Sequence, residues 1–255
     1  MKISAIINYC TYDQKFINGV INSVRHVCSE IIVTYCDRFY DDTEENHDLI
    51  NSTIKSNSDV KFVKMTYSEL KSMAEIDPTD RCNEFKFCSY SRFLGRMNAS
   101  YDSDYMMFMD SDEILDPDEF LKFTMSDKFS YGDNYHLESY WYFRDTIYQS
   151  IQREPSVVLS YKPTFDVYAL DSDRYSLLKC GVNKNHVMNS FHGPPMVHHF
   201  SWARTKDEIL KKVSTWGHKY DRDWKSLIEN EFSHDFNGTD FVHGYSYNIL
   251  PRSII

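Results

Sequence analysis

The sequence predicts an α/β fold in which a mixed, mostly parallel central sheet is flanked by helices. Short apolar strand patterns alternate with helical patterns along the first 120 residues, as they do in folds built from βαβ units. One of these strands, Glu30–Tyr35, is apolar on both faces, which is typical of a parallel strand covered by helices on both sides. Because the chain has only 8 Gly and 7 Pro in 255 residues, no obvious linker interrupts it. We therefore expect one continuous domain over residues 1–255.

The first half of the chain begins in a βαβαβ order. The strand segments alternate or run apolar, and the first helical segment carries apolar side chains at spacings of three and four residues. We expect strands at Ile3–Tyr9, Glu30–Tyr35 and Val60–Met65, and helices at Phe16–Val27 and Asp41–Ser58. This order is that of one half of a Rossmann-like sheet.

A short apolar strand, Tyr105–Met109, runs directly into the acidic segment Asp110-Ser111-Asp112-Glu113. The helical segment before it, Ser89–Tyr101, carries Arg92 and Arg96 four residues apart and therefore on one face. In open α/β sheets the ligand crevice lies outside the carboxyl ends of the strands. We therefore expect the chemistry of this protein at the acidic segment.

The second half of the chain predicts further strands and one helix. Asn134–Arg144 and Ser156–Tyr161 are rich in aromatic and β-branched residues, so they either extend the sheet or form a layer of their own. Lys206–Tyr220 has a helical period, with Thr205 at the N-cap position. The tail Glu229–Ile255 has little periodicity and predicts no element.

Composition excludes several classes of protein. A formal net charge of -10 argues against a general nucleic-acid or anionic-membrane binder, because those surfaces need a positive field. No apolar run reaches the ~20 residues of a membrane span, and Met1-Lys2 leads into a strand pattern and not a secretory signal. The six cysteines form no Cys-x-x-Cys pair, so we expect buried reduced thiols. These features predict a cytoplasmic protein without a transmembrane segment or a nucleic-acid partner.

Asp110 and Asp112 form the strongest motif of the chain. Two carboxylates one residue apart at a strand end repel each other unless a hard cation such as Mg²⁺ or Mn²⁺ binds them, and a diphosphate would complete the oxygen ligands. The cation would neutralise the charge that develops on a departing nucleoside diphosphate. The Asp-x-Asp segments at residues 102–104, 171–173 and 221–223 lie in polar surroundings, which is typical of solvated turns.

The run Phe108–Leu115, an apolar strand that enters Asp-x-Asp-Glu, resembles the hallmark of GT-A-fold glycosyltransferases, especially the family-2-like enzymes. The element order of the first 120 residues follows that family, and His198-His199-Phe200-Ser201-Trp202 is similar to its His-x-Ser-Trp region. The resemblance implies a nucleotide-sugar-binding half at residues 1–120 and an acceptor-side half with a C-terminal extension at residues 121–255. The usual Asp-Asp pair after the second strand is Cys36-Asp37 here, which departs from the family pattern.

The same resemblance implies roles for individual residues. Asp110 would contact the ribose or the metal, and Asp112 would coordinate the metal. A downstream histidine often completes the metal shell, and because both His198 and His199 match the pattern, both remain candidates. Asp37 would bind the base or the ribose, although an aspartate at a strand end also serves as a turn or helix-capping residue.

Basic and aromatic side chains are candidates for the rest of the donor site. Arg92, Arg96 and the weaker candidate Lys86 offer positive charge to a diphosphate, and a solvated helix face is the alternative interpretation. Trp202 offers a stacking surface for the donor, as do aromatic residues in the run Tyr140–Phe143. Side chains alternate along a strand, so about half of that run belongs to the core.

A catalytic base is needed only if the reaction inverts the anomeric centre, because a carboxylate must then take the proton of the acceptor hydroxyl. Glu138 and Asp145, which flank the aromatic strand, are the first candidates, and Asp166 is the next. No spacing decides among them.

We expect a Mn²⁺- or Mg²⁺-dependent glycosyltransferase, hexosyl- or pentosyl-, that moves one sugar from a nucleoside-diphosphate sugar to a glycan, lipid or protein. UDP is the commonest nucleotide in the family. Absence of Gln-x-x-Arg-Trp argues against a processive polymerase. The alternatives are a nucleotidyltransferase, a carbohydrate-binding protein and a metal-dependent hydrolase. A nucleotidyltransferase normally has a Gly-rich basic loop after its first strand, whereas Asn8–Gln14 contains neither Gly nor Arg.

Overall fold

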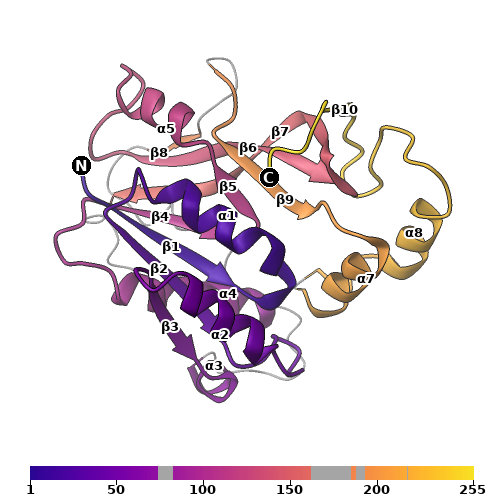
Figure 1. Cartoon of the computed structure of the whole chain (residues 1–255), viewed down its shortest axis with the longest axis horizontal. Helices are drawn as coiled ribbons and strands as arrows, with labels where there is room; N and C mark the ends of the chain where they lie inside the picture. The colour runs from indigo at the N-terminus through magenta and orange to yellow at the C-terminus, as the bar shows by residue number, and fades with distance from the viewer. Residues whose placement is uncertain (74–82, 162–184, 188–192, 217) are drawn as a thin grey trace.

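The computed structural model describes the chain apart from residues 74–82, 162–184, 188–192 and 217 (Figure 1). Its strands are β1 (Ile3–Tyr9), β2 (Glu30–Cys36), β3 (Lys61–Met65), β4 (Tyr105–Asp110), β5 (Glu113–Leu115), β6 (Asn134–Phe143), β7 (Asp145–Tyr161), β8 (Asn185–Val187), β9 (Val197–Trp202) and β10 (Tyr247–Ile249). Its helices are the 3-10 turn η1 (Thr11–Asp13) and the α-helices α1 (Gln14–Val24), α2 (His47–Ser56), α3 (Tyr67–Met73), α4 (Asn83–Met97), α5 (Pro117–Thr124), α7 (Lys206–Thr215) and α8 (Trp224–Glu231).

The first half of the sheet is parallel, in the strand order β3-β2-β1-β4. Successive side chains of β1 point to opposite faces, so Ala5 and Ile7 pack in the core that includes α1, while Ile6 packs on the other side with Met106 and Phe108 of β4. Helix α4 covers that second face at close range, because a Cβ on its Gly95 would lie 2.4 Å from Cγ2 of Ile6. Burial on both faces explains why these strands are apolar along their length.

The second half of the sheet is mixed. Strand β7 pairs antiparallel with β4 and β6, β9 runs parallel to β6, and β5 pairs antiparallel with β9. The hairpin between β6 and β7 turns at Arg144, whose φ is 60°. Strand β7 is 17 residues long. The second half therefore extends the first sheet and does not form a separate layer.

Helices α7 and α8 form a smaller layer beyond the carboxyl end of β1 (Figure 1). Their apolar faces pack on aromatic side chains of β6 and β9, with Trp202, Ile209 and Trp224 buried together. Helix α7 begins with the predicted N-cap, since the Thr205 hydroxyl accepts from the backbone N–H of Glu208, and the Glu208 carboxylate accepts from the backbone N–H of Thr205. This cap fixes where α7 starts relative to the end of β9.

The predicted fold class, an α/β fold with a mixed, mostly parallel central sheet flanked by helices, is confirmed. The unassigned tail contributes part of α8 and the edge strand β10, which is held by pairing with β7 and not by a pattern of its own. Cys10, Cys28 and Cys36 are free thiols, as expected. In the part of the chain that the structure describes, no helix has the length and apolar character needed to cross a membrane.

Candidate functional site

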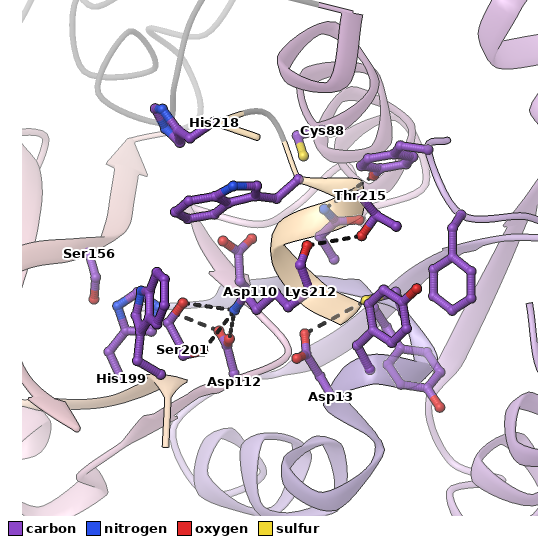
Figure 2. Close-up of a pocket in the computed structure, with 18 of the residues that line it drawn as sticks. Asp13, Cys88, Asp110, Asp112, Ser156, His199, Ser201, Lys212, Thr215 and His218 are labelled. Carbon is purple, nitrogen blue, oxygen red and sulfur yellow. Dashed lines mark hydrogen bonds and ion pairs between the residues drawn. The ribbon is translucent and has the colours of Figure 1, made fainter. Parts of the chain in front are cut away.

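A cavity of about 600 Å³ opens at the carboxyl ends of β1 and β4, between the sheet and helices α7 and α8 (Figure 2). Strand pairing places Asn8 of β1 directly beside Asp110 of β4, so both strands end at the cavity. Charged and polar side chains of both halves line it, among them Asp13, Arg92, Asp110, Asp112, Glu154, His199 and Lys212. This volume is in the range of small-molecule sites. The cavity lies where the sequence predicts a ligand site.

Asp110 lies at the wall of the cavity and keeps about a third of its side chain exposed (31%). One of its oxygens, Oδ1, accepts a hydrogen bond from Nη2 of the buried Arg92 at 2.9 Å. Its backbone N–H donates to Oε2 of Glu113 at 2.6 Å, and Glu113 is completely buried. The third acidic residue of the motif therefore fixes the backbone of the first, and Asp110 itself stays accessible.

Asp112 is buried and lies among cationic groups (Figure 2). Its Oδ2 accepts from Nη2 of Arg204 at 3.2 Å and from Nζ of Lys212 at 3.0 Å. Its Oδ1 lies 3.5 Å from Nε2 of His199. Burial alone would raise the pKa of this carboxyl, but Lys212, His199 and Arg204 outweigh burial and hold that pKa well below its usual range. Asp112 is therefore ionised at neutral pH.

Arg204 joins both halves of the molecule beneath the cavity. It is buried, donates to the backbone carbonyl of Tyr12 at 2.6 Å, and forms an ion pair with Asp13 as well as with Asp112. The second oxygen of Asp13 accepts from the Ser111 hydroxyl at 2.7 Å. One guanidinium thus neutralises two buried carboxylates and holds the loop after β1 against the motif.

The two candidate histidines lie on opposite faces of β9, because neighbouring side chains of a strand alternate. His199 faces the cavity, Asp112 and the ring of Trp141. His198 packs against Tyr140 and forms a 2.8 Å hydrogen bond with the hydroxyl of Tyr142. Of the two alternatives that the sequence left open, only His199 lies beside the acidic motif.

Several other candidates lie away from this cavity. Asp37 accepts a 2.8 Å hydrogen bond from the backbone N–H of Tyr67 at the beginning of α3. This contact is typical of an aspartate that caps a helix or stabilises a turn. Lys86 and Arg96 are on α4 but are not among the described residues that line the cavity, whereas Arg92 is. The pattern of the helix did not distinguish Arg92 from Arg96.

The predicted bases also lie elsewhere. Glu138 is buried and lines a separate, smaller cavity with Glu119 and Lys122. Asp145 is exposed at the beginning of β7, where it accepts from the backbone N–H of Ile147. Asp166 lies outside the described residues. Glu154 of β7 is a carboxylate of the second half that does line the main cavity, and it accepts a hydrogen bond from the hydroxyl of Tyr245.

The aromatic candidates differ in their position relative to the cavity. Trp141 lines the cavity, and Tyr142 and Phe143 are completely buried. Trp202 lines the cavity although it is only 2% exposed, and it packs against Trp216 and Trp224, so most of its ring belongs to the core of the second half. A stacked pair that the sequence did not indicate, Tyr12 and Phe39, lines the opposite side at 4.1 Å between ring centroids.

The residues of the site that were not predicted from the sequence include Asp13, Glu154, Arg204 and Lys212. Asp13 had a usable signal, because it is a buried acid in the polar turn after β1, and the carboxyl ends of adjacent parallel strands meet at one edge. Arg204 and Lys212 had none, since they belong to a Lys-rich helix and its N-terminal turn, and only the fold brings them within 3.2 Å of Asp112.

The predicted divalent cation does not fit these side chains as they lie. Oδ2 of Asp112 already accepts from Arg204 and Lys212, its Oδ1 lies 3.5 Å from Nε2 of His199, and Oδ1 of Asp110 accepts from Arg92. Among the described residues, no three His, Cys, Asp or Glu side chains form a group that could hold a metal ion. An ion at Oδ2 of Asp112 would have to displace the ammonium of Lys212.

Comparisons with known proteins find similarity only at the level of structure. No protein-family model and no curated protein sequence matches the chain. One similar solved structure is the inositol-1-phosphate CTP transferase from T. maritima, with 10% identity over 89% of this chain and 96% of that chain and a TM-score of 0.47. A second is the galactosyltransferase LgtC in complex with donor and acceptor sugar analogs, with 11% identity over 89% of this chain and 95% of that chain and a TM-score of 0.41. A third is GalNAc-T7 with UDP, GalNAc and Mn²⁺, with 11% identity over 91% of this chain and 50% of that chain and a TM-score of 0.47. TM-scores below 0.5 assign no role to any residue here, so the assignment of the site depends on its own geometry.

Proposed function

We propose that this protein is a glycosyltransferase that moves one sugar from a nucleoside-diphosphate sugar to a hydroxyl group of a glycan, lipid or protein acceptor. UDP is the nucleotide we expect, and the sugar is a hexose or a pentose. One observation supports this most strongly. Asp110 and Asp112, at the carboxyl end of a buried parallel strand, border a cavity of about 600 Å³ together with Arg92 and Lys212.

The donor would bind along the first half of the sheet. Tyr12 and Phe39 present aromatic surface to a base, and Asp110 offers an acceptor oxygen to a ribose hydroxyl. Arg92 and Lys212 offer positive charge to the diphosphate, although the protein as a whole has a net charge of -10. Charge that develops on the leaving diphosphate would be stabilised there by groups already in place.

The acceptor would enter from the second half, where Glu154 and Trp141 line the cavity. In an inverting reaction the acceptor oxygen forms a bond to the anomeric carbon as the bond from that carbon to the diphosphate oxygen breaks. The proton of the acceptor hydroxyl must move to a base. We assign that role to Glu154 in place of Glu138 and Asp145, because it is the carboxylate of β6 and β7 that lines this cavity.

Product analysis tests the proposal. The protein is incubated with UDP-, GDP- and dTDP-sugars and a set of glycan acceptors, and products are followed by ³¹P NMR and mass spectrometry. We expect free nucleoside diphosphate and an acceptor heavier by one sugar. Formation of pyrophosphate from a nucleoside triphosphate and a sugar 1-phosphate, with no glycosylated product, would instead show a nucleotidyltransferase.

Asp110→Asn should lower the transfer rate by about 100-fold, because Arg92 and the ribose hydroxyl would lose a charged hydrogen-bond acceptor. Asp102→Asn is a matched control, since Asp102 belongs to a second Asp-Ser-Asp sequence that lies on the surface and pairs with Lys2. Equal activity of the two variants would contradict the role given to Asp110.

A further inference from the structure

Lys212 lies beside Asp112 and lines the cavity (Figure 2). Its Nζ donates to Asp112 Oδ2 at 3.0 Å, to the Ser201 hydroxyl at 2.7 Å and to the Ser201 carbonyl at 3.1 Å. The ammonium therefore has three oxygen neighbours, one of them a carboxylate, and borders the cavity. Oxygen atoms of the protein thus surround a positive charge that belongs to a side chain of the same protein.

Helix α7 holds the ammonium in this place. The capping box at Thr205 fixes the first turn of the helix, and the buried Ile209 and Val213 on either side of Lys212 fix its rotation against the core. The Lys212 side chain is only 18% exposed. The charge is thus positioned before any ligand arrives, which lowers the cost of ordering it on binding.

We propose that the ammonium of Lys212, and not a divalent metal ion, supplies the positive charge at Asp112 that binds the donor diphosphate. The proposal rests on the glycosyltransferase function given above and deepens it, because it states how the donor is held. Arg92, paired with Asp110, supplies a second positive group at the same cavity.

The hydrogen bonds of Lys212 allow it to take a phosphate oxygen without leaving a buried acceptor unsatisfied. The Ser201 carbonyl also accepts from Nε of Arg204 at 2.9 Å. One N–H of Lys212 can therefore turn from that carbonyl to the diphosphate, while its bonds to Asp112 and to the Ser201 hydroxyl remain. A small ammonium with three donors suits this exchange.

The test is isothermal titration with UDP, GDP and dTDP, each in EDTA and in Mn²⁺, on the wild-type protein and on Lys212→Met, Lys212→Arg and Lys225→Met. We expect one nucleotide to bind the wild type with dissociation constants that agree within about twofold in EDTA and Mn²⁺. Lys212→Met should weaken binding in EDTA by about tenfold or more, because a charged hydrogen-bond partner is lost. Lys225→Met removes the same charge from a side chain of α8 that is 77% exposed, and should bind as the wild type does.

Circular dichroism establishes whether Lys212→Met folds. If it does not, Lys212→Arg keeps the charge and is expected to bind the nucleotide in EDTA. Wild-type binding that is at least tenfold weaker in EDTA than in Mn²⁺ would overturn the inference and leave the proposed function standing. A folded Lys212→Met protein that binds as tightly as the wild type in EDTA would also overturn it. Binding of no nucleotide under either condition would overturn the proposed function together with the inference.

Discussion

The two halves of the sheet contribute different chemistry to one cavity. The parallel half supplies the carboxylates Asp13, Asp110 and Asp112, which follow the ends of neighbouring strands. The mixed half and the helices after it supply Arg204 and Lys212, which neutralise two of those carboxylates. The acids occupy positions that local strand patterns determine, whereas the cations reach them only through the long-range packing of α7 on the sheet. Residues that belong to no recognisable sequence motif can therefore stabilise a motif in the other half of the fold.

Arg204→Met is expected to have the largest effect, because it breaks the connection between the halves. It would leave Asp13 and Asp112 buried without their shared guanidinium and lower the free energy of unfolding by about 3–5 kcal/mol. Urea denaturation measures the change. Arg38→Met, which removes an exposed ion pair with Asp42, should cost less than about 1 kcal/mol. Similar losses for both variants would contradict the bridging role of Arg204.

Glu154→Gln tests whether the second half carries the proton transfer. The substitution keeps the shape of the side chain but removes the base, so kcat for transfer should fall about 100-fold or more, while nucleotide binding in the titration stays at the wild-type value. Glu138→Gln is the matched control in the other cavity and should retain most activity. A pH profile of kcat that keeps its acidic limb in Glu154→Gln would show that the base is another group.

His198, in the second half, makes the stability of the protein sensitive to acid. Burial lowers the pKa of His198 to about 4. Between pH 6.5 and 4 the unfolded chain therefore binds a proton that the folded protein does not, so this stabilisation is complete above pH 6.5 and is lost as pH falls to 4. The loss is about 3 kcal/mol.

The measurement that checks this is the free energy of unfolding of the wild-type protein and of His198→Gln between pH 7.5 and 4. The difference between the two proteins should shrink as the pH falls, because the variant has no imidazole to protonate. A constant difference over that range would contradict a buried neutral His198.

Thr205→Ala is expected to have the smallest effect. It removes half of the capping box of α7 and should lower the unfolding free energy by about 1 kcal/mol. The same change at Thr124, whose hydroxyl only bonds within the last turn of α5, should cost less. Equal losses would indicate that the start of α7 does not depend on its cap.

The sequence predicted the first half well, because β1 and β4 are short apolar runs that end in polar segments and need no distant partner to be recognised. It placed Asp110 and Asp112 at the cavity, but the burial of Asp112 depends on Arg204 and Lys212, more than 90 residues away along the chain. The strand pattern around residues 134–144 predicted β6. It did not predict which carboxylates and aromatic rings of β6 face the cavity, because their direction depends on the bulges in the pairing of β6 with β7. Glu154 was not predicted for the same reason.

A crystal structure of the protein grown with a UDP-sugar and Mn²⁺, with data collected at a wavelength where manganese scatters anomalously, tests the central claim most directly. The account predicts a diphosphate in the cavity beside Arg92, within hydrogen-bonding distance of Lys212 Nζ, and no anomalous peak between the diphosphate and Asp112. A nucleotide bound elsewhere, or a manganese peak bridging Asp110, Asp112 and the diphosphate with Lys212 turned away, would contradict it.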